Sequence, residues 1–409
     1  MKAQSSACVT LPQNLNLLPK HFEMNTSYNF FTPTKILFGP GRLHDLKEIA
    51  PAFGRKCLLV CRPLQGSLKS TYKRIEKILN TAKIEVSFFD EIVPNPTLEG
   101  IEKGVAIAAK NKVDFILGVG GGSVMDSAKL MALLHHPSGI IDWEKAFSTY
   151  DHPFNYAPSK PTTLPFVAVS TTSGSGSQCT QAAVVSDPKK KEKITLFHLD
   201  LFPKVAIVDP ELMTSVPALV TAATGFDAFT HAFESYLGER TSPLTEQMSL
   251  QAIQLVIENL PKAIKEPKNI EYRTHLAWAD TLAGMCLSNG GADLPHPLGE
   301  IIGGICPRIA HGETLAIVYP AFLEYKKENA SNKFKNIATS LGLDCNSNQL
   351  ISKIIELLDV TQLSKSLKRA ALTEEERREI SAHPLLKKLE PKNGDAIINM
   401  MKKSINQNP

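Results

Sequence analysis

The first half of the chain alternates short apolar runs with longer segments of helical periodicity. The apolar runs lie at 56–61, 84–89, 113–119, 165–169 and 205–209, and the helical segments between them lie at 68–79, 98–110 and 125–134. Strand and helix in alternation are typical of parallel strands joined by helices that pack on the sheet. We therefore predict an α/β domain whose parallel sheet is covered on both faces.

The pattern changes after Pro217, where long helical segments follow one another with few strand-like runs. These segments lie at 222–237, 245–260, 272–287, 348–358 and 373–381. The change predicts an all-helical second domain, and it divides the chain into an N-terminal extension (1–24), an α/β domain (25–212) and a helical domain (213–409). The extension has no apolar segment of the kind that a secretory signal needs, and Met24 is an alternative start.

Composition excludes several classes of protein. The 409 residues are 43% hydrophobic and 21% charged, which is ordinary for a globular protein and argues against disorder or a coiled coil. The formal net charge is only +4, and the one basic cluster, at 189–193, is short and contains Glu192, so we interpret it as a solvated turn. No apolar stretch approaches the roughly 18 residues of a membrane span. We expect neither a nucleic-acid partner nor a membrane.

The seven cysteines are scattered, odd in number and without a CxxC pair. This pattern disfavours a disulfide framework and indicates a reducing compartment, so we expect a cytoplasmic protein.

A glycine turn, Gly120-Gly121-Gly122-Ser123, joins the predicted strand at 113–119 to the helix that begins near Met125. Glycines before a helix N-terminus let a phosphate approach the free backbone N–H groups. Ser123 is a candidate helix cap, and Asp126 lies three residues on, as in a capping box. The GxGxxG fingerprint is not met, because Ser123 occupies its third glycine position. A simple tight turn stays open as an alternative.

A second segment rich in serine, threonine and glycine, 170–177, directly follows the predicted strand at 165–169. Small hydroxyl residues offer many hydrogen-bond donors in little volume, which suits polyphosphate binding, although a flexible linker has a similar composition. Two such turns in one α/β domain together favour a dinucleotide site.

Four residues of the second half form a candidate metal site. Asp227 and His231 are four apart, so a helix places both side chains on one face, among apolar flanks where unpartnered polar groups are costly. His296 and His311 lie in apolar, glycine-rich surroundings downstream. One carboxylate and three imidazoles suit Fe²⁺, Zn²⁺ or Mn²⁺, and a site with an open position would act as a Lewis acid.

These motifs resemble the iron-containing (group III) alcohol dehydrogenase family from about Phe31 to Tyr319. The stretches that carry the resemblance are 35–41, 93–97, 120–126, 205–211 continuing through 227–234, and 296–300 through 311–312. The resemblance implies the fold shared with dehydroquinate synthase, in which an α/β dinucleotide-binding domain faces a helical metal-binding and substrate domain. It also implies a homodimer.

The resemblance implies the site residues as well. The metal ligands would be Asp227, His231, His296 and His311, and the cofactor would be bound by Asn95, Gly120, Gly121, Gly122, Ser123, Asp126, Thr171, Thr172, Ser175 and Lys193. The implied reaction is reversible hydride transfer between a metal-bound alkoxide and NAD or NADP, with Fe²⁺ as the metal, or Zn²⁺, and a small alcohol or aldehyde as substrate. The alternatives are a dehydroquinate synthase-like or glycerol dehydrogenase-like enzyme, or a non-catalytic cofactor-binding protein.

The sequence departs from the family pattern at four points. Glu300 stands where many relatives have a histidine near the nicotinamide, so the proton path runs through Glu300 or through solvent. The spacing from His296 to His311 is about one residue longer than usual, which leaves open an alignment with His296 as the relay residue and Ala292 at the ligand position. Gln178 replaces a common glutamate. Arg62 follows the first predicted strand where NAD-specific relatives carry an acid, and it predicts a preference for NADP.

Overall fold

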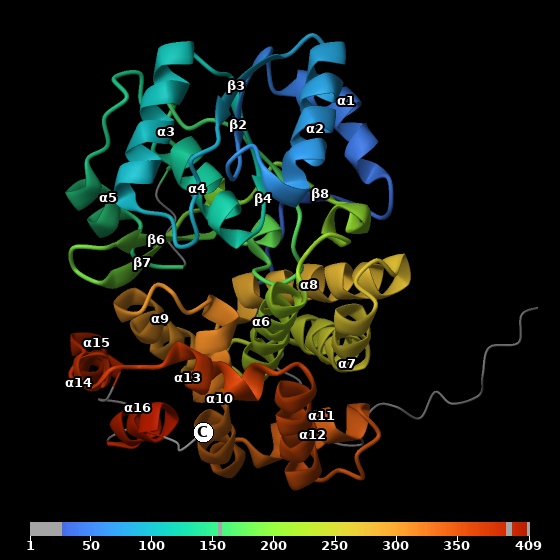
Figure 1. Cartoon of the computed structure of the whole chain (residues 1–409), viewed down its shortest axis with the longest axis vertical. Coiled ribbons are helices and arrows are strands. Elements are labelled where there is room, and N and C mark those ends of the chain that lie inside the picture. Colours follow the sequence, from blue (N-terminus) through green and yellow to red (C-terminus); the bar gives the residue numbers. More distant parts are fainter. Residues whose placement is uncertain (1–26, 154–157, 390–394, 407–409) are drawn as a thin grey trace, which may run out of the picture.

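The computed structural model describes residues 27–153, 158–389 and 395–406, so the predicted extension at 1–24 lies outside the described residues. The chain forms an α/β layer and a helical layer that meet along one side (Figure 1). No helix in these ranges combines the length and apolar character that a membrane span requires.

A six-stranded sheet, parallel at every pairing, forms the centre of the α/β half. Its spatial order is β1-β8-β5-β4-β2-β3, and the bounds are β1 (Lys35–Phe38), β2 (Lys56–Val60), β3 (Glu85–Phe89), β4 (Phe115–Gly120), β5 (Phe166–Ser170) and β8 (Val205–Val208). The central strands β4 and β5 are buried along their whole length, as apolar runs covered on both faces require.

Helices cover both faces of this sheet. One apolar cluster includes residues of α3 (Leu98–Asn111) and α4 (Gly122–Leu133), and a second includes residues of α1 (Leu46–Ile49) and α2 (Lys69–Thr81). The short helix α5 (Trp143–Thr149) completes the first cluster. The predicted parallel α/β sheet is therefore confirmed.

An antiparallel hairpin, β6 (Ala182–Asp187) and β7 (Glu192–Phe197), lies beside the main sheet and was not among the predicted strands. The interpretation of the basic cluster as a solvated turn holds for 189–191, which are exposed between the two strands. It is wrong for Lys193, which belongs to β7 and is half-buried because α9 packs against that strand.

The second half is helical throughout, as predicted. Its helices are α6 (Ala218–Leu237), α7 (Pro243–Lys265), α8 (Ile270–Gly290), α9 (Pro295–Ile305), α10 (His311–Asn329), α11 (Ser331–Ser340), α12 (Ser347–Val360), α13 (Ser366–Ala370), α14 (Glu374–Ser381), α15 (Pro384–Leu389) and α16 (Ala396–Asn406). Helix α6 is buried nearly all round, because α7, α8 and α10 pack against it.

Glycines allow two close backbone contacts, one between the two halves and one within the helical half. An added Cβ at Gly176 (φ +59°) would lie 2.5 Å from the Cα of Gly284 on α8, and one at Gly312 would lie 1.9 Å from the carbonyl oxygen of Ala223 on α6. The loop after β5 therefore lies directly against α8, and the start of α10 lies directly against α6.

Candidate functional site

Four side chains from three helices converge on one point of the helical half. Asp227 and His231 project from α6, His296 is the second residue of α9, and His311 is the first residue of α10. The Oδ1 atom of Asp227 lies 3.5 Å from Nε2 of His231, 3.9 Å from Nε2 of His296 and 3.7 Å from Nε2 of His311. The structure thus brings Asp227, His231 and His296 close enough together to share one ion, and it places His311 beside Asp227.

This geometry fits a divalent cation. Ligand atoms arranged tetrahedrally about an ion at about 2.1 Å lie about 3.4 Å apart, slightly closer than the separations from Asp227. Oδ1 of Asp227 and Nε2 of His296 are buried and have no hydrogen-bond partner in the described part of the chain, which is costly unless an ion lies between them. His296 faces Asp227, whereas Ala292 offers no donor atom, so the geometry fits the alignment in which His296 is a ligand.

The environment adjusts the protonation of these groups. Burial raises the pKa of Asp227 to about 8, and burial lowers the pKa of both His231 and His311 well below the ordinary value for histidine. A carboxylate that resists ionisation and imidazoles that resist protonation are both satisfied by a cation held among them.

Glu234 orients one of the imidazoles and was not assigned a role from the sequence. Its fully buried carboxylate accepts a hydrogen bond from Nδ1 of His296 at 2.8 Å and another from the backbone N–H of Asp293 at 2.7 Å. Burial lowers the pKa of His296, but the negative charge of Glu234 outweighs this and the pKa rises to about 9, so a bound cation would displace the proton on Nε2 and leave that lone pair facing Asp227. Glu234 lies seven residues, or two helical turns, after Asp227, and that spacing was the available indication of a shared face.

The other two imidazoles have weaker outer partners. Nδ1 of His231 lies 3.2 Å from the carbonyl oxygen of Gly174, which belongs to the loop after β5. Nδ1 of His311 is buried without a hydrogen-bond partner within the described ranges. Only His296 is therefore oriented by a charged group.

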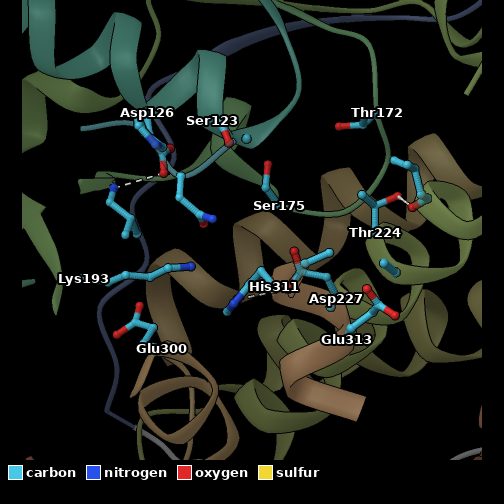
Figure 2. Close-up of a pocket in the computed structure, with 18 of the residues that line it drawn as sticks. Ser123, Asp126, Thr172, Ser175, Lys193, Thr224, Asp227, Glu300, His311 and Glu313 are labelled. Carbon is cyan, nitrogen blue, oxygen red and sulfur yellow. Dashed lines mark hydrogen bonds and ion pairs between the residues drawn. The ribbon is translucent and has the colours of Figure 1, made fainter. Parts of the chain in front are cut away.

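A cavity of about 300 Å³ opens between the two halves beside these ligands (Figure 2). Asp227 and His311 lie on its floor, and its walls include seven of the residues predicted to bind the cofactor: Asn95, Gly122, Ser123, Asp126, Thr172, Ser175 and Lys193. The predicted residues Arg62, Gly120, Gly121 and Thr171 do not line it. Arg62 instead lies exposed just after β2.

The glycine turn gives the cavity its shape. An added Cβ at Gly120 would lie 2.5 Å from a methyl group of Val124, and one at Gly121 would lie 2.7 Å from the hydroxyl of Thr172. Helix α4 begins at Gly122 and points its N-terminal N–H groups toward the cavity.

The predicted capping by Ser123 and Asp126 is wrong. Gly121 is the N-cap residue and no side chain caps α4, because the helix begins one residue before Ser123. Ser123 therefore faces the cavity (Figure 2). Asp126 accepts hydrogen bonds from the hydroxyl of Ser177 and the backbone N–H of Val184, and so ties α4 to the loop after β5 and to the hairpin.

A second cavity, of about 320 Å³, lies on the other side of the ligands. It shares Asp126, Ser175, Val184, Asp227, Glu300 and His311 with the first cavity, so the two meet at the candidate metal site. Its remaining walls include His231, His296, several apolar side chains and Arg240. A dinucleotide in the first cavity and a substrate in the second would approach each other beside the four ligands.

Glu300 and Lys193 are half-buried groups of opposite charge whose charges influence each other. Both line the first cavity and lie on the same side of His311 (Figure 2). Burial raises the pKa of Glu300, and the charge of Lys193 opposes that rise; burial in turn lowers the pKa of Lys193. A carboxylate with a raised pKa beside both cavities suits proton transfer.

Gln178, where relatives commonly carry glutamate, has a clear partner. Its side-chain amide donates to the buried carboxylate of Asp280 at 2.7 Å, and the same carboxylate accepts from the backbone N–H of Gly176. A glutamate at this position would place two buried carboxylates in contact.

Two family models match consecutive parts of the chain. One, described as iron-containing alcohol dehydrogenase, matches residues 33–210, and the other, the C-terminal part of the Fe-containing alcohol dehydrogenase family, matches residues 221–406.

Comparison with individual proteins also finds alcohol dehydrogenases. The NADPH-dependent butanol dehydrogenase of Clostridium saccharobutylicum is 32% identical over 85% of this chain and 88% of that protein. The NAD-dependent methanol dehydrogenase of Bacillus methanolicus is 31% identical over 77% of this chain and 80% of that protein. Among solved structures, an archaeal halo-thermophilic alcohol dehydrogenase from a Red Sea brine pool superposes with a TM-score of 0.84 at 28% identity, covering 94% of this chain and 100% of the other.

Proposed function

The chain belongs to the iron-containing alcohol dehydrogenase family and is an NAD(P)-linked oxidoreductase, and we propose that Asp227, His231, His296 and His311 hold its divalent metal. The observation that carries the proposal is the convergence of a buried carboxylate oxygen and three imidazole nitrogens, of which Oδ1 of Asp227 and Nε2 of His296 have no hydrogen-bond partner among the described residues. When bound, the metal supplies Lewis-acid polarisation of a hydroxyl or carbonyl oxygen.

The protein residues set the charge of this site. Asp227 contributes one negative charge and the three neutral imidazoles contribute none, so a divalent ion with its ligands keeps a net positive charge. That charge lies where the two cavities meet, and it favours the ionised form of an alcohol hydroxyl in the second cavity.

The cofactor is held along the first cavity. The N–H groups at Gly122 and Ser123, at the start of α4, bind the pyrophosphate, and the hydroxyls of Thr172 and Ser175 add donors from the loop after β5. A dinucleotide held there would have its nicotinamide end near Asp227 and His311, and it would supply hydride transfer to or from a substrate carbon.

Glu300 accepts the hydroxyl proton during alcohol oxidation, at the position where many relatives have a histidine. The carboxylate lines both cavities, and Lys193 beside it stabilises the ionised form that can take up a proton. Solvent entering through the cavities is the alternative acceptor.

Arg62 favours NADP over NAD. An arginine just after β2 attracts a 2′-phosphate that an acidic residue would repel. We expect Arg62→Asp to weaken NADPH binding by about tenfold or more, since a charge-assisted hydrogen bond is lost and a repulsive charge is added. Fluorescence titration with both reduced cofactors tests this, and much tighter binding of NADH by the unaltered protein would overturn it.

The metal is Fe²⁺ in this proposal, with Zn²⁺ as the alternative, because a carboxylate and three imidazoles accept either ion. We propose a cytoplasmic homodimer whose subunits have domains at 25–212 and 213–409, and this proposal is based on membership of the family. The six cysteines in the described ranges are free and five of them are buried, which supports a reducing compartment. Light scattering tests the dimer.

The decisive experiment combines metal analysis with activity. We expect metal-stripped protein, reloaded anaerobically with Fe²⁺ or Zn²⁺, to oxidise primary alcohols with NADP or NAD. Asp227→Ala and His311→Ala should abolish both metal retention and turnover while cofactor binding persists. Substantial turnover by either variant after metal removal would reject the proposed ligand set.

A further inference from the structure

We propose that the proton taken up by Glu300 during alcohol oxidation reaches solvent through a third cavity, which is separate from the cofactor and substrate cavities. This route rests on the proposed function, in which Glu300 accepts the hydroxyl proton. The hairpin, α9 and α15 form its walls, and water in the cavity carries the proton.

The third cavity, of about 210 Å³, lies between the hairpin, α9 and α15. Glu300 is the one described residue that lines all three cavities. On α9, Glu300 is half-buried and Ile301 is buried, whereas Pro384 and Lys388 on α15 are exposed. The cavity therefore leads from the carboxylate toward the surface. A dinucleotide would fill the first cavity and a substrate the second, so the third is the one that neither reactant occupies.

Two glycines of α9 allow the hairpin to form one wall of the third cavity. An added Cβ at Gly304 would lie 2.5 Å from the carbonyl oxygen of Lys191, and one at Gly303 would lie 3.0 Å from Nζ of Lys193. Gly303 lies three residues after Glu300, on the same face of α9. The close packing therefore brings the ammonium group of Lys193 to the face of the helix that carries Glu300.

Strand β7 connects the carboxylate of Glu300 with the other cavities. Thr195 lines the second cavity, and Lys193, two residues earlier on the same face of the strand, lines the first and the third. Burial raises the pKa of Glu300, and the charge of Lys193 and a hydrogen bond from the Thr195 hydroxyl oppose that rise. Both groups favour the ionised carboxylate, which is the form that takes up a proton from the second cavity.

One proton leaves the site for each hydride transferred. The alcohol hydroxyl gives its proton to the carboxylate of Glu300, the carbon–hydrogen bond gives its hydrogen and both electrons to the oxidised nicotinamide, and the carbon–oxygen single bond becomes a carbonyl. Glu300 regains its charge before the next turnover by giving the proton to water in the third cavity, which passes it to bulk solvent. The cavity has room for several water molecules, since each takes about 30 Å³ in the liquid.

Water carries the proton because the imidazole in the third cavity is engaged. The Nδ1 atom of His383 accepts a hydrogen bond from the backbone N–H of Leu385 at 3.2 Å, so the ring proton is on Nε2. Burial lowers the pKa of His383 further than the charge of Glu192 raises it. The ammonium of Lys191, also on this wall, forms an ion pair with Glu379 at 2.7 Å.

The test fills the third cavity in the metal-loaded enzyme. Leu385→Trp places an indole in the cavity, and Leu367→Trp is the matched control, because Leu367 is also half-buried and lines a cavity that shares none of its described residues with the other three. Lys388→Trp at the exposed end, with its exposed neighbour in Lys387→Trp as control, provides a second pair if Leu385→Trp does not fold.

The measurement follows both products of the reaction in time. Stopped-flow absorbance records reduced nicotinamide, and a pH indicator in weak buffer records the released proton, with a series of 1-alkanols and either NADP or NAD. In the unaltered protein and both controls, we expect proton release to keep pace with nicotinamide reduction.

The filled cavity should slow only the steps after the first turnover. In Leu385→Trp, the ionised Glu300 still accepts one proton, so the first equivalent of reduced nicotinamide should form at the unaltered rate. Proton release should then lag, and kcat should fall by about tenfold with KM unchanged. In a Glu300→Gln background, Leu385→Trp should cause no further loss, because the carboxylate that delivers the proton is absent.

Each result decides between the proposals. Proton release that keeps pace with nicotinamide reduction in the folded variants at 385 and 388 would overturn the route. A slower first turnover, or an equal loss with and without Glu300→Gln, would mean that the indole disturbs the structure, and would overturn the route as well. These results leave the proposed function intact, whereas an unaltered enzyme that reduces neither cofactor with any of the alkanols would overturn that function.

Discussion

The hydrogen bond between Glu234 and His296 allows the strength of the metal site to be changed without altering a ligand. In the unaltered protein, one carboxylate oxygen of Glu234 accepts both hydrogen bonds, from Nδ1 of His296 and from the N–H of Asp293. Glu234→Gln keeps the volume of the side chain and one oxygen that can accept both bonds. The substitution therefore removes mainly the negative charge. Glu234→Leu removes the charge and both hydrogen bonds.

Loss of an outer carboxylate partner typically weakens metal affinity by about 10- to 100-fold, or about 1.4 to 2.7 kcal/mol. We expect Glu234→Gln near the lower value, since the orientation of the ring survives. Glu234→Leu should lie near the upper value, since a buried N–H of His296 and one of Asp293 lose their acceptor.

The assay is competition for Zn²⁺ or Fe²⁺ between the metal-free protein and a chelator of known affinity at fixed pH, with thermal unfolding of the metal-free proteins recorded in parallel. Asp209→Asn is the matched control. This carboxylate is equally buried and accepts backbone N–H groups from Gly41, Leu43 and Glu211, but it lies in the α/β half away from the ligands. The control should lower stability and leave metal affinity unchanged. If both variants at Glu234 are folded and bind metal as tightly as the unaltered protein, the orienting role is refuted.

Three further predictions concern pH, the proton and the cofactor. Folding raises the pKa of Asp227 from 3.8 to about 8, so the unfolded metal-free chain releases this proton at lower pH than the folded chain does. The metal-free protein should therefore lose stability as pH rises through that range. Thermal unfolding of Asp227→Asn should show a smaller loss of stability over the same range. Glu300→Gln should lower kcat for alcohol oxidation by about 100-fold at neutral pH if the carboxylate accepts the proton, whereas an unchanged pH–rate profile would assign that role to solvent. Gly121→Ala should weaken NADPH binding by about tenfold in a fluorescence titration, because its Cβ would meet Thr172 at 2.7 Å and displace a wall of the cofactor cavity. Gly100→Ala, whose Cβ finds ordinary contact at 3.5 Å, is the control, and equal weakening in both would contradict the steric reason.

The sequence alone determined the class of the fold and the local parts of the site. Apolar runs of strand length between helical segments sufficed for the parallel sheet, because burial on both faces leaves a continuous apolar pattern in each central strand. The spacing of Asp227 and His231 sufficed for a shared face, since four residues make about one helical turn. The glycine turn before α4 could also be predicted, because it depends only on residues that are adjacent in the sequence.

Only the tertiary structure decided how the distant parts meet. The position of His296 depends on how α9 packs against α10 and β7, so the spacing along the chain left two alignments open until His296 was seen to face Asp227. The hairpin of β6 and β7 was not predicted, because its strands pair mainly with each other. The partial burial of Lys193 on β7 was therefore not predicted either. Glu234 acquires its surroundings from Asp293 and His296, which lie far along the chain. Periodicity records which face of an element is buried, but which residues of two buried faces come into contact depends on the packing of the whole chain.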